Sequence, residues 1–121
     1  MRAKLRSEPT QTWRRPVNEP TRKRFEARAE VFKAMGHPTR LFMLEELTRG
    51  PRCVCELQEM VAADMSTVSK HLSILRGVGL VECERRGTQM IYSITCECFG
   101  GFVKCLESVL SANRQRLAEL K

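Results

Sequence analysis

The sequence lacks the features of a membrane-inserted or exported chain. None of its apolar runs approaches the ~20 residues that span a bilayer. Its first 24 residues are too polar, and contain too many prolines, for a secretory signal peptide. These two absences predict a cytoplasmic protein without membrane contacts.

The sequence also has little of what most enzymes need. Its 121 residues are enough for one small domain, which excludes most large enzyme folds. A domain of this size buries a modest share of its surface, so a dimer interface would let it bury more. Neither a C-x-x-C motif nor a βαβ pattern is found, and both are typical of thiol oxidoreductases. We therefore expect a binding module and not an enzyme, with a thiol oxidoreductase as a remote alternative.

The net charge of +7 is unevenly distributed along the chain. Residues 1–24 hold eight of the 21 basic side chains and two of the 14 acidic ones, so they carry +6 and the remaining residues carry +1. With three prolines and few apolar residues, this segment is predicted to be a flexible basic N-terminal arm, followed by a folded domain over residues 25–121. The arm either contacts the phosphates or minor groove of a nucleic acid or is only a solvated leader.

Six cysteines are many for a short cytoplasmic chain, because a reducing compartment does not preserve disulfides. They are arranged as Cys53-x-Cys55, a lone Cys83, Cys96-x-Cys98 and Cys105. There are only two histidines, His37 and His71, so any metal site must be built mainly from sulfur. Thiolates select soft ions such as arsenic(III), antimony(III), cadmium and lead. The cysteines predict metal, metalloid or redox chemistry, with no organic cofactor.

Apolar spacing predicts four helices in the first two thirds of the chain. The first covers residues 21–35 and stops at Gly36, and the second begins at Pro38 and covers residues 38–48. The third carries Val54, Leu57 and Val61, and the fourth carries Val68, Leu72 and Leu75. A tight turn joins the third and fourth helices, and Asp64 is suited to cap the fourth.

A β-hairpin and one long helix complete the chain. Residues 80–84 and 89–94 are predicted strands, joined by a turn that contains Gly87. The last segment has apolar residues at near-heptad spacing, which predicts one amphipathic helix: Phe102, Leu106, Val109, Leu117 and Leu120. The order of elements is that of a winged helix-turn-helix domain, a mainly α (α+β) fold with a two-stranded wing.

The fourth helix and the hairpin tip carry the candidate DNA contacts. On a helical wheel, short polar or basic side chains lie opposite or beside the apolar stripe: Ser66, Thr67, Ser69, Lys70, His71 and Ser73. Such side chains reach base edges and phosphates in the major groove of double-stranded DNA. Arg85, Arg86 and Thr88 at the hairpin tip are placed to contact the backbone or minor groove beside it.

The spacing within each cysteine group limits what that group can hold. In a regular helix Cys53 and Cys55 would point about 200° apart, so a shared ion requires a non-helical start of the third helix. An ion bound there would distort the turn that leads into the DNA-reading helices, so that the two binding events are coupled. Cys98 and Cys105 are ~10.5 Å apart along a continuous helix, too far for one ion.

A break at Gly100-Gly101 would bring the C-terminal cysteines together. Cys96 and Cys98 would then fold back towards Cys105 and form a three-sulfur site. In the alternative interpretation Cys105 is a small buried hydrophobic residue. Cys83, on a predicted strand, is expected to be a packing residue.

Four segments resemble the ArsR/SmtB family: Arg52–Leu57, Ser66–Leu72 with Leu75, Gly79-Leu80-Val81 and Gly36–Arg40. Members of that family are homodimeric bacterial repressors that leave operator DNA when a metal or metalloid binds, with dimer contacts from the first and last helices. The Cys53-Val54-Cys55 run is similar to that of the arsenic- and antimony-sensing members, whose fuller pattern is Cys-x-Cys-x-x-Cys. Here Gln58 occupies the third position. The family's zinc site on the last helix needs histidines, and none follows His71.

The resemblance implies a homodimeric repressor released from its operator by arsenic(III), or by antimony(III), cadmium or lead. A third thiolate would come from Cys96, Cys98 or Cys105 of either subunit, or these three would form the site, since other family members bind arsenic near the last helix. The alternative in the same fold is a persulfide- or redox-sensing repressor that closes a disulfide or polysulfide bridge between two cysteines. That alternative needs exposed thiols of low pKa.

Overall fold

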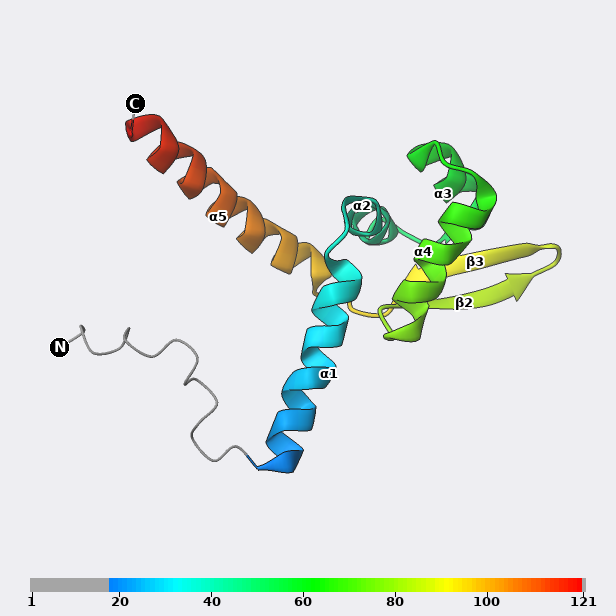
Figure 1. The fold of residues 1–121 in the computed structure, drawn as a ribbon. Helices are drawn as coiled ribbons and strands as arrows, with labels where there is room; N and C mark the ends of the chain where they lie inside the picture. Colours follow the sequence, from blue (N-terminus) through cyan, green and yellow to red (C-terminus); the bar gives the residue numbers. More distant parts are fainter. Residues whose placement is uncertain (1–17, 121) are drawn as a thin grey trace.

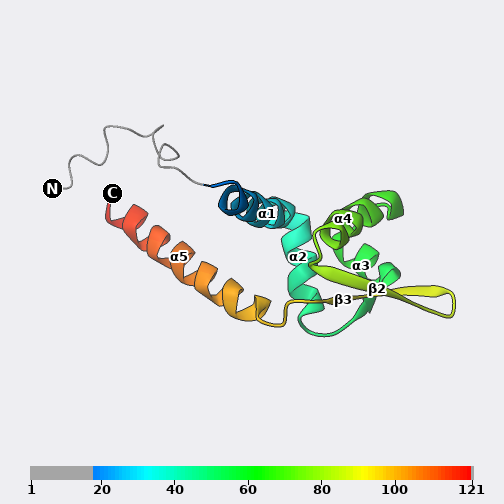
Figure 2. The same cartoon turned by 90° about the horizontal axis from the view of Figure 1, so that it is seen from below.

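The computed structural model describes residues 18–120 and has the winged helix-turn-helix architecture (Figure 1). In chain order its elements are α1 (Glu19–Met35), α2 (Pro38–Leu47), β1 (Arg52–Cys53), α3 (Val54–Val61), α4 (Met65–Gly77), β2 (Val81–Arg86), β3 (Gln89–Ile94) and α5 (Phe99–Glu119). The α3–α4 unit and the β2–β3 wing lie at one end of the molecule, and α1 and α5 extend from the other (Figures 1 and 2).

Helix α1 begins two residues earlier than the apolar pattern predicted. The side chain of Asn18 accepts a hydrogen bond from the Thr21 backbone N–H at 2.9 Å, and this N-cap starts the helix at Glu19. Residues 19–24, assigned to the flexible arm by their charge, are therefore helical, because the cap and the following apolar stripe outweigh the local excess of Lys and Arg. Residues 1–17 lie outside the described part of the chain, and the role of the arm stays a prediction.

The turn between α3 and α4 is built as the sequence predicted. Ala62 has φ 51°, in the left-handed region, and ends α3. Asp64 then caps α4, because its Oδ1 atom accepts from the Thr67 backbone N–H at 2.8 Å and from Ser66 Oγ at 3.0 Å. These hydrogen bonds hold the pKa of the Asp64 carboxyl below its usual value. The N-cap prediction is confirmed.

The sheet has three strands, one more than the predicted two-stranded wing. Its order is β1-β3-β2, and β1 pairs antiparallel with β3 through Arg52 opposite Tyr92 and Cys53 opposite Ile91. The sequence gave no sign of β1 because two residues are too few to show alternation. This short strand attaches the start of α3 directly to the base of the wing.

The core consists of two clusters that meet around α2 and α4. The first packs α1, α2, the end of α4, the start of β2 and the start of α5 together through Met35, Leu44, Leu75, Val81 and Phe99. The second joins α2, α3 and α4 through four side chains with no exposed surface or almost none: Met43, Leu57, Val68 and Leu72. The helix-turn-helix thus has its own core, which continues into the base of α1 and α5.

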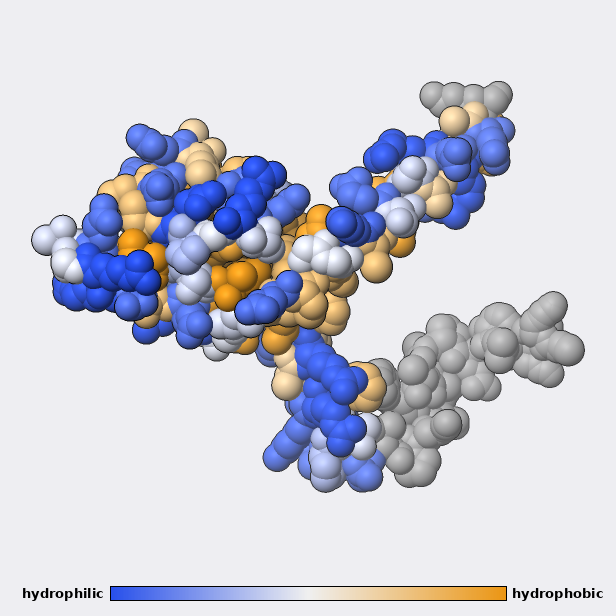
Figure 3. Space-filling model, turned by 180° about the vertical axis from the view of Figure 1, so that it is seen from behind, coloured by the Kyte–Doolittle hydropathy of each residue, from blue (hydrophilic) through white to orange (hydrophobic). Residues whose placement is uncertain are grey.

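Helix α5 is one continuous helix from Phe99, and Gly100-Gly101 lies inside it without breaking it. Beyond their packed bases, α1 and α5 expose large apolar side chains to solvent in the single chain: Phe25, Phe32, Leu106, Val109, Leu110, Leu117 and Leu120. Seen from behind, apolar surface gathers where the two helices leave the body (Figure 3). Between residues 18 and 120, no helix combines the length and apolarity needed to cross a bilayer.

Candidate functional site

The outer face of α4 is a continuous polar surface. Ser66, Thr67, Ser69, Lys70 and Ser73 are all exposed, while Val68, Leu72 and Leu75 on the opposite face are fully buried. Two of the exposed residues also shape the helix, because Ser66 Oγ and the Thr67 backbone N–H both bind the Asp64 carboxylate. This leaves Ser69, Lys70 and Ser73 free of side-chain hydrogen bonds within the described part of the chain.

The wing carries its basic residues at the tip, away from the helical core. Arg85, Arg86 and Thr88 are exposed around the turn, where Gly87 adopts φ 63°, a conformation that favours glycine. Arg86 makes an exposed ion pair with Glu84 at 3.4 Å, and such pairs contribute little stability. Both guanidinium groups are therefore available to a polyanion.

His71 is directed inwards, unlike the other candidate DNA contacts on α4. Its Nδ1 atom lies 3.1 Å from Arg40 Nη1, and its ring lies 4.5 Å from that of His37, centroid to centroid. Arg40 also donates to the Ala34 carbonyl, and His37 caps α2 by accepting from the Thr39 N–H at 3.1 Å. These contacts join the end of α1, the start of α2 and the middle of α4. In this geometry His71 positions the helix that carries the polar surface; the sequence pattern missed Arg40 because its partner is 31 residues away.

The ionisation of His71 is expected to make stability depend on pH. Burial lowers the pKa of His71, and the nearby His37, Arg40 and Lys70 lower it further. The folded state thus favours the neutral ring, whose stabilising contribution is present above the unfolded pKa of about 6.5 and is lost as the pH falls from there towards the folded pKa. Urea midpoints measured between pH 8 and pH 5 should fall on acidification, and fall less steeply in His71→Gln. An equal slope in both proteins would rule out this role, and Ser73→Ala on the same helix is the control.

Cys53 and Cys55 lie at the junction of the wing and the helix-turn-helix. Cys53 ends β1 in an extended conformation, is buried, and donates its backbone N–H to Glu56 Oε1 at 2.9 Å. Cys55 is exposed on the first turn of α3. Both line a cavity of about 310 Å³ that also touches Ser69 of α4 and Thr88 of the wing. The pair therefore straddles a non-helical to helical boundary, as the spacing required.

Cys96 and Cys98 form the closest pair of thiols. Their Sγ atoms are 3.0 Å apart in the short segment between β3 and α5. The segment is anchored on one side because Thr95 donates its N–H to the Leu80 carbonyl at 3.0 Å and its hydroxyl to the Gly79 carbonyl at 2.6 Å. It is anchored on the other side by the first turn of α5, whose Phe99 N–H donates to the Cys96 carbonyl at 3.2 Å. The thiol pair thus connects the residues that follow α4 to the start of α5.

The ionisation of this pair bears on which chemistry it can perform. A hydrogen bond with Cys96 and the charge of a Cys96 thiolate raise the pKa of the exposed Cys98 thiol. One proton shared between two sulfurs is difficult to remove without a ligand to replace it. The thiolate is the reactive form both in oxidation and in ion binding, so either reaction at this pair requires the proton to leave.

The remaining cysteines stand apart from the pair. Cys105 is exposed on α5, ~10.5 Å along the helix axis from Cys98, so the break that would have gathered three sulfurs does not occur. The alternative interpretation, in which Cys105 is buried, is also wrong for the single chain, because Cys105 is exposed. Cys83 lies opposite Tyr92 in the β2–β3 ladder and is half-buried. Burial raises the pKa of Tyr92, and its hydrogen bond with Cys83 adds to this effect, consistent with a packing role.

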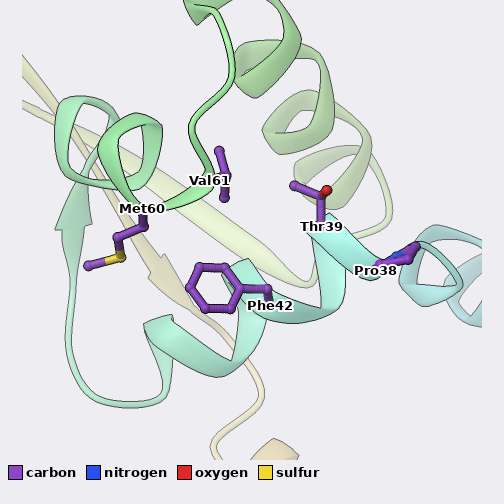
Figure 4. Close-up of a pocket in the computed structure, with 5 residues that line it drawn as sticks. All are labelled: Pro38, Thr39, Phe42, Met60 and Val61. Carbon is purple, nitrogen blue, oxygen red and sulfur yellow. The ribbon is translucent and has the colours of Figure 1, made fainter.

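Over residues 18–120, no three side chains among His, Cys, Asp and Glu come close enough to hold one metal ion. A separate hollow of about 250 Å³ between α2 and the end of α3 is lined by Pro38, Thr39, Phe42, Met60 and Val61 and contains no thiol (Figure 4).

Comparisons with known proteins agree with this architecture. Residues 37–82 match the family described as "Bacterial regulatory protein, arsR family". An HTH-type transcriptional regulator of Methanocaldococcus jannaschii is 34% identical over 87 residues, which are 71% of this chain and 98% of that protein. The HTH-type transcriptional repressor SmtB of Mycobacterium tuberculosis is 33% identical over 75 residues, 62% of this chain and 56% of SmtB.

Two solved structures resemble the fold closely. The crystal structure of Rv0081 from M. tuberculosis has a TM-score of 0.71 and 32% identity, and the match covers 84% of this chain and 99% of Rv0081. The homodimeric winged helix-turn-helix DNA-binding domain of Mb0332 from Mycobacterium bovis has a TM-score of 0.72 and 25% identity, with 84% of this chain and 94% of that domain covered.

Proposed function

Because this chain belongs to the ArsR family of DNA-binding transcriptional regulators, which are not enzymes, we propose that it is a homodimeric repressor. A thiophilic ligand releases it from its operator, and we assign that ligand as arsenic(III). The observation that carries the ligand assignment is the 3.0 Å separation of the Cys96 and Cys98 sulfurs. Soft ions bind thiolates in preference to oxygen and nitrogen donors.

The DNA-binding part of the proposal rests on exposure and charge. Helix α4 presents Ser69, Lys70 and Ser73 without competing side-chain contacts, and Arg85 and Arg86 extend the same surface at the wing tip. We assign α4 to the major groove and the wing to the backbone or minor groove beside it. The second subunit would be held by the apolar faces of α1 and α5, which the single chain leaves exposed.

Two of the three bonds that inorganic arsenic(III) forms can be supplied by one subunit. Cys96 and Cys98 supply two thiolates, and inorganic arsenic(III) keeps one further bond for a thiolate of the second subunit or a hydroxide. Since this pair lies between Thr95, which is bonded to the residues after α4, and the first turn of α5, a ligand that changes the sulfur separation shifts α5 relative to α4. Ligand binding and operator binding then share a coupling free energy. Cys53 and Cys55 are the second candidate site, because their cavity touches both α4 and the wing.

The test is anaerobic operator binding, with an operator selected by the protein from random duplexes. Arsenite is expected to weaken binding by the wild type about 10- to 100-fold, a usual size for such coupling. Cys96→Ser and Cys98→Ser should lose this response, and Cys83→Ser, a cysteine outside both sites, should keep it. Loss of the arsenite response in Cys53→Ser or Cys55→Ser alone would show that the ligand binds at the start of α3. Release by polysulfide but not by arsenite would contradict the metalloid assignment and support the persulfide-sensing alternative.

The wing contributes a prediction of its own. Arg85→Ala combined with Arg86→Ala should weaken binding to all sequences about equally and lower the slope of log affinity against log salt by roughly 2, because each arginine displaces about one counterion. Lys104→Ala on α5 removes an exposed charge from the far side of the fold and serves as the control. An unchanged salt slope in the double variant would exclude phosphate contacts at the wing.

A further inference from the structure

The hollow between α2 and the end of α3 is an apolar surface that the described chain leaves uncovered. Phe42 and Met60, which come from different helices, line it together with Pro38, Thr39 and Val61 (Figure 4). The two large side chains are 40% and 42% exposed. Single exposed apolar residues need no explanation, but two that face one hollow of about 250 Å³ form a place where another apolar side chain can be laid.

The surface around this hollow is negatively charged. Residues 41–64 contain five acidic side chains and two basic ones, which gives a net charge of −3. Both basic side chains lie beside the same carboxylate, that of Glu46, at 4.0 and 3.9 Å. Glu45 on α2 and Glu56 on α3 are exposed, and each lies one helical turn from a large apolar side chain of the hollow. The hollow is therefore flanked by carboxylates and suits an apolar group that is followed by cations.

Residues 1–17, outside the described part of the chain, have that chemistry. They contain five basic side chains and one acidic one, a net charge of +4. Trp13 is the one tryptophan of the protein, and Arg14 and Arg15 follow it directly. Tryptophan and arginine are enriched among the side chains that dominate protein–protein contacts. An indole ring also packs favourably on an aromatic ring and on a methionine sulfur, the two groups that the hollow offers.

The length of the chain decides which hollow Trp13 can enter. Trp13 stands five residues before Asn18, so it lies at most ~18 Å from it. The hollow of the same subunit lies beyond the opposite end of α1, because Pro38 follows Met35, and the 17 residues of α1 alone are ~25 Å long. Asn18 is at the end of the molecule where α1 and α5 expose their apolar faces (Figures 1 and 2). Trp13 therefore falls short of its own hollow and lies on the side of a second subunit.

We propose that Trp13 docks in the hollow of the partner subunit, with Arg14 and Arg15 beside the carboxylates that flank it. The inference rests on the proposed homodimer, and it assigns residues 1–17 to a contact between subunits instead of to DNA. The contact joins α1 of one subunit to the helix-turn-helix of the other. It thereby helps to fix the separation of the two α4 helices, which has to match the spacing of the operator half-sites.

The fluorescence of Trp13 tests this contact in the full-length protein, because no other tryptophan contributes. In the wild-type dimer the emission should lie at a shorter wavelength than that of N-acetyltryptophanamide, and acrylamide should quench it less. Phe42→Ser and Met60→Ser should each shift the emission to that of the free compound. Ile74→Ser, which changes a similarly exposed apolar residue on α4 (37%), should leave it unchanged. A wild-type dimer with a fully exposed Trp13, or an emission that neither hollow substitution shifts, would overturn the proposal.

Mixed dimers identify the subunit that provides the hollow. Trp13→Ala chains, whose hollow is intact, are added in excess to Phe42→Ser chains, which supply the tryptophan. In the mixed dimer this tryptophan faces an intact hollow, so its emission should return to the shorter wavelength. An unchanged spectrum, with mixed dimers verified by native mass spectrometry, would overturn docking on the partner subunit.

Sedimentation measures how much the contact stabilises the dimer. Trp13→Ala should raise the dimer dissociation constant about 10- to 100-fold, because it removes two anchors from each dimer. Reversal of both charges in Arg14→Glu with Arg15→Glu should also weaken the dimer, most strongly at low salt, and Glu45→Lys should restore part of the loss. An unchanged dissociation constant in Trp13→Ala would contradict the contact.

The same samples separate this inference from the proposed function. A wild-type protein that is monomeric at every concentration contradicts both the homodimer and the contact. A dimer that arsenite releases from its operator, but in which Trp13 is exposed, supports the proposed function and overturns this inference alone. An emission that shifts only when operator DNA is added would assign residues 1–17 to DNA and would also overturn it.

Discussion

Leu72→Ala should destabilise the protein by about 3 kcal/mol and lower its Tm by roughly 10 to 20 °C. Leu72 has no exposed surface and packs against Met43 of α2, Leu57 of α3 and Val68 of its own helix. Truncation removes the buried methyl groups and leaves a cavity at the point where the three helices meet, which the surrounding side chains close only in part. Urea and thermal unfolding at equal protomer concentration provide the measurement, because dimer stability depends on concentration.

The adjacent exposed position supplies the control for Leu72. Ser73→Ala removes a side chain of the same helix that contacts solvent, and alanine is the better helix former, so unfolding should change by less than about 0.5 kcal/mol. A loss below about 1 kcal/mol in Leu72→Ala would mean that α4 is not anchored through this cluster.

Lys70→Glu is expected to weaken operator binding about 100-fold, or roughly 2.7 kcal/mol, at moderate salt. Lys70 is exposed at the centre of the polar face of α4, the segment assigned to the major groove. The substitution removes one favourable charge and adds a carboxylate beside the phosphates. Fluorescence anisotropy with labelled operator measures the effect, and its size should shrink as salt rises.

Lys104→Glu makes the same charge change on the exposed side of α5, away from α4 and the wing. It should change operator affinity by a few fold at most, through the net charge alone. Equal losses in the two variants would show that binding depends on overall charge and not on the face of α4. A normal unfolding curve for each protein excludes a loss of fold as the cause.

Because residues 25–121 are nearly neutral, single charged side chains have a large effect on DNA affinity. With a net charge of +1 outside the first 24 residues, the domain has little long-range attraction for DNA, so affinity depends on a few placed contacts. If the protein is the repressor proposed above, a modest shift of one helix is then enough to release it from its operator. This is consistent with a ligand site that acts on the base of α5 instead of covering the DNA-binding face.

Local patterns were sufficient to predict much of this fold. The helical stripes, the Asp64 cap and the glycine turn of the wing each depend on neighbours within four residues along the chain, and the structure confirmed all three. The strand β1 was missed because it is only two residues long and pairs with β3 about 40 residues later. The start of α1 was predicted two residues too late, because the segment was assigned to the arm by its charge and the N-cap at Asn18 was missed.

The same distinction, between features set by local spacing and features set by distant contacts, applies to the candidate sites. The exposed residues of α4 follow from helical periodicity, yet His71, on the same helix, turns inwards to Arg40 and His37 because those side chains arrive from another helix. The sequence shows that the chain is rich in cysteine and that four of its six cysteines form two C-x-C pairs. It could not show that Gly100-Gly101 continues α5 and thereby separates Cys105 from the others.

The sequence by itself determined the order of the elements, the polar face of α4 and the reliance on sulfur, since these follow from residue type and short-range spacing. Only the tertiary structure decided that Cys96 and Cys98 come within 3.0 Å of each other at the wall of an apolar cavity. That arrangement requires α1, the residues after α4 and the start of α5 to pack together, and contacts between segments so distant in the chain leave no periodic signal in it.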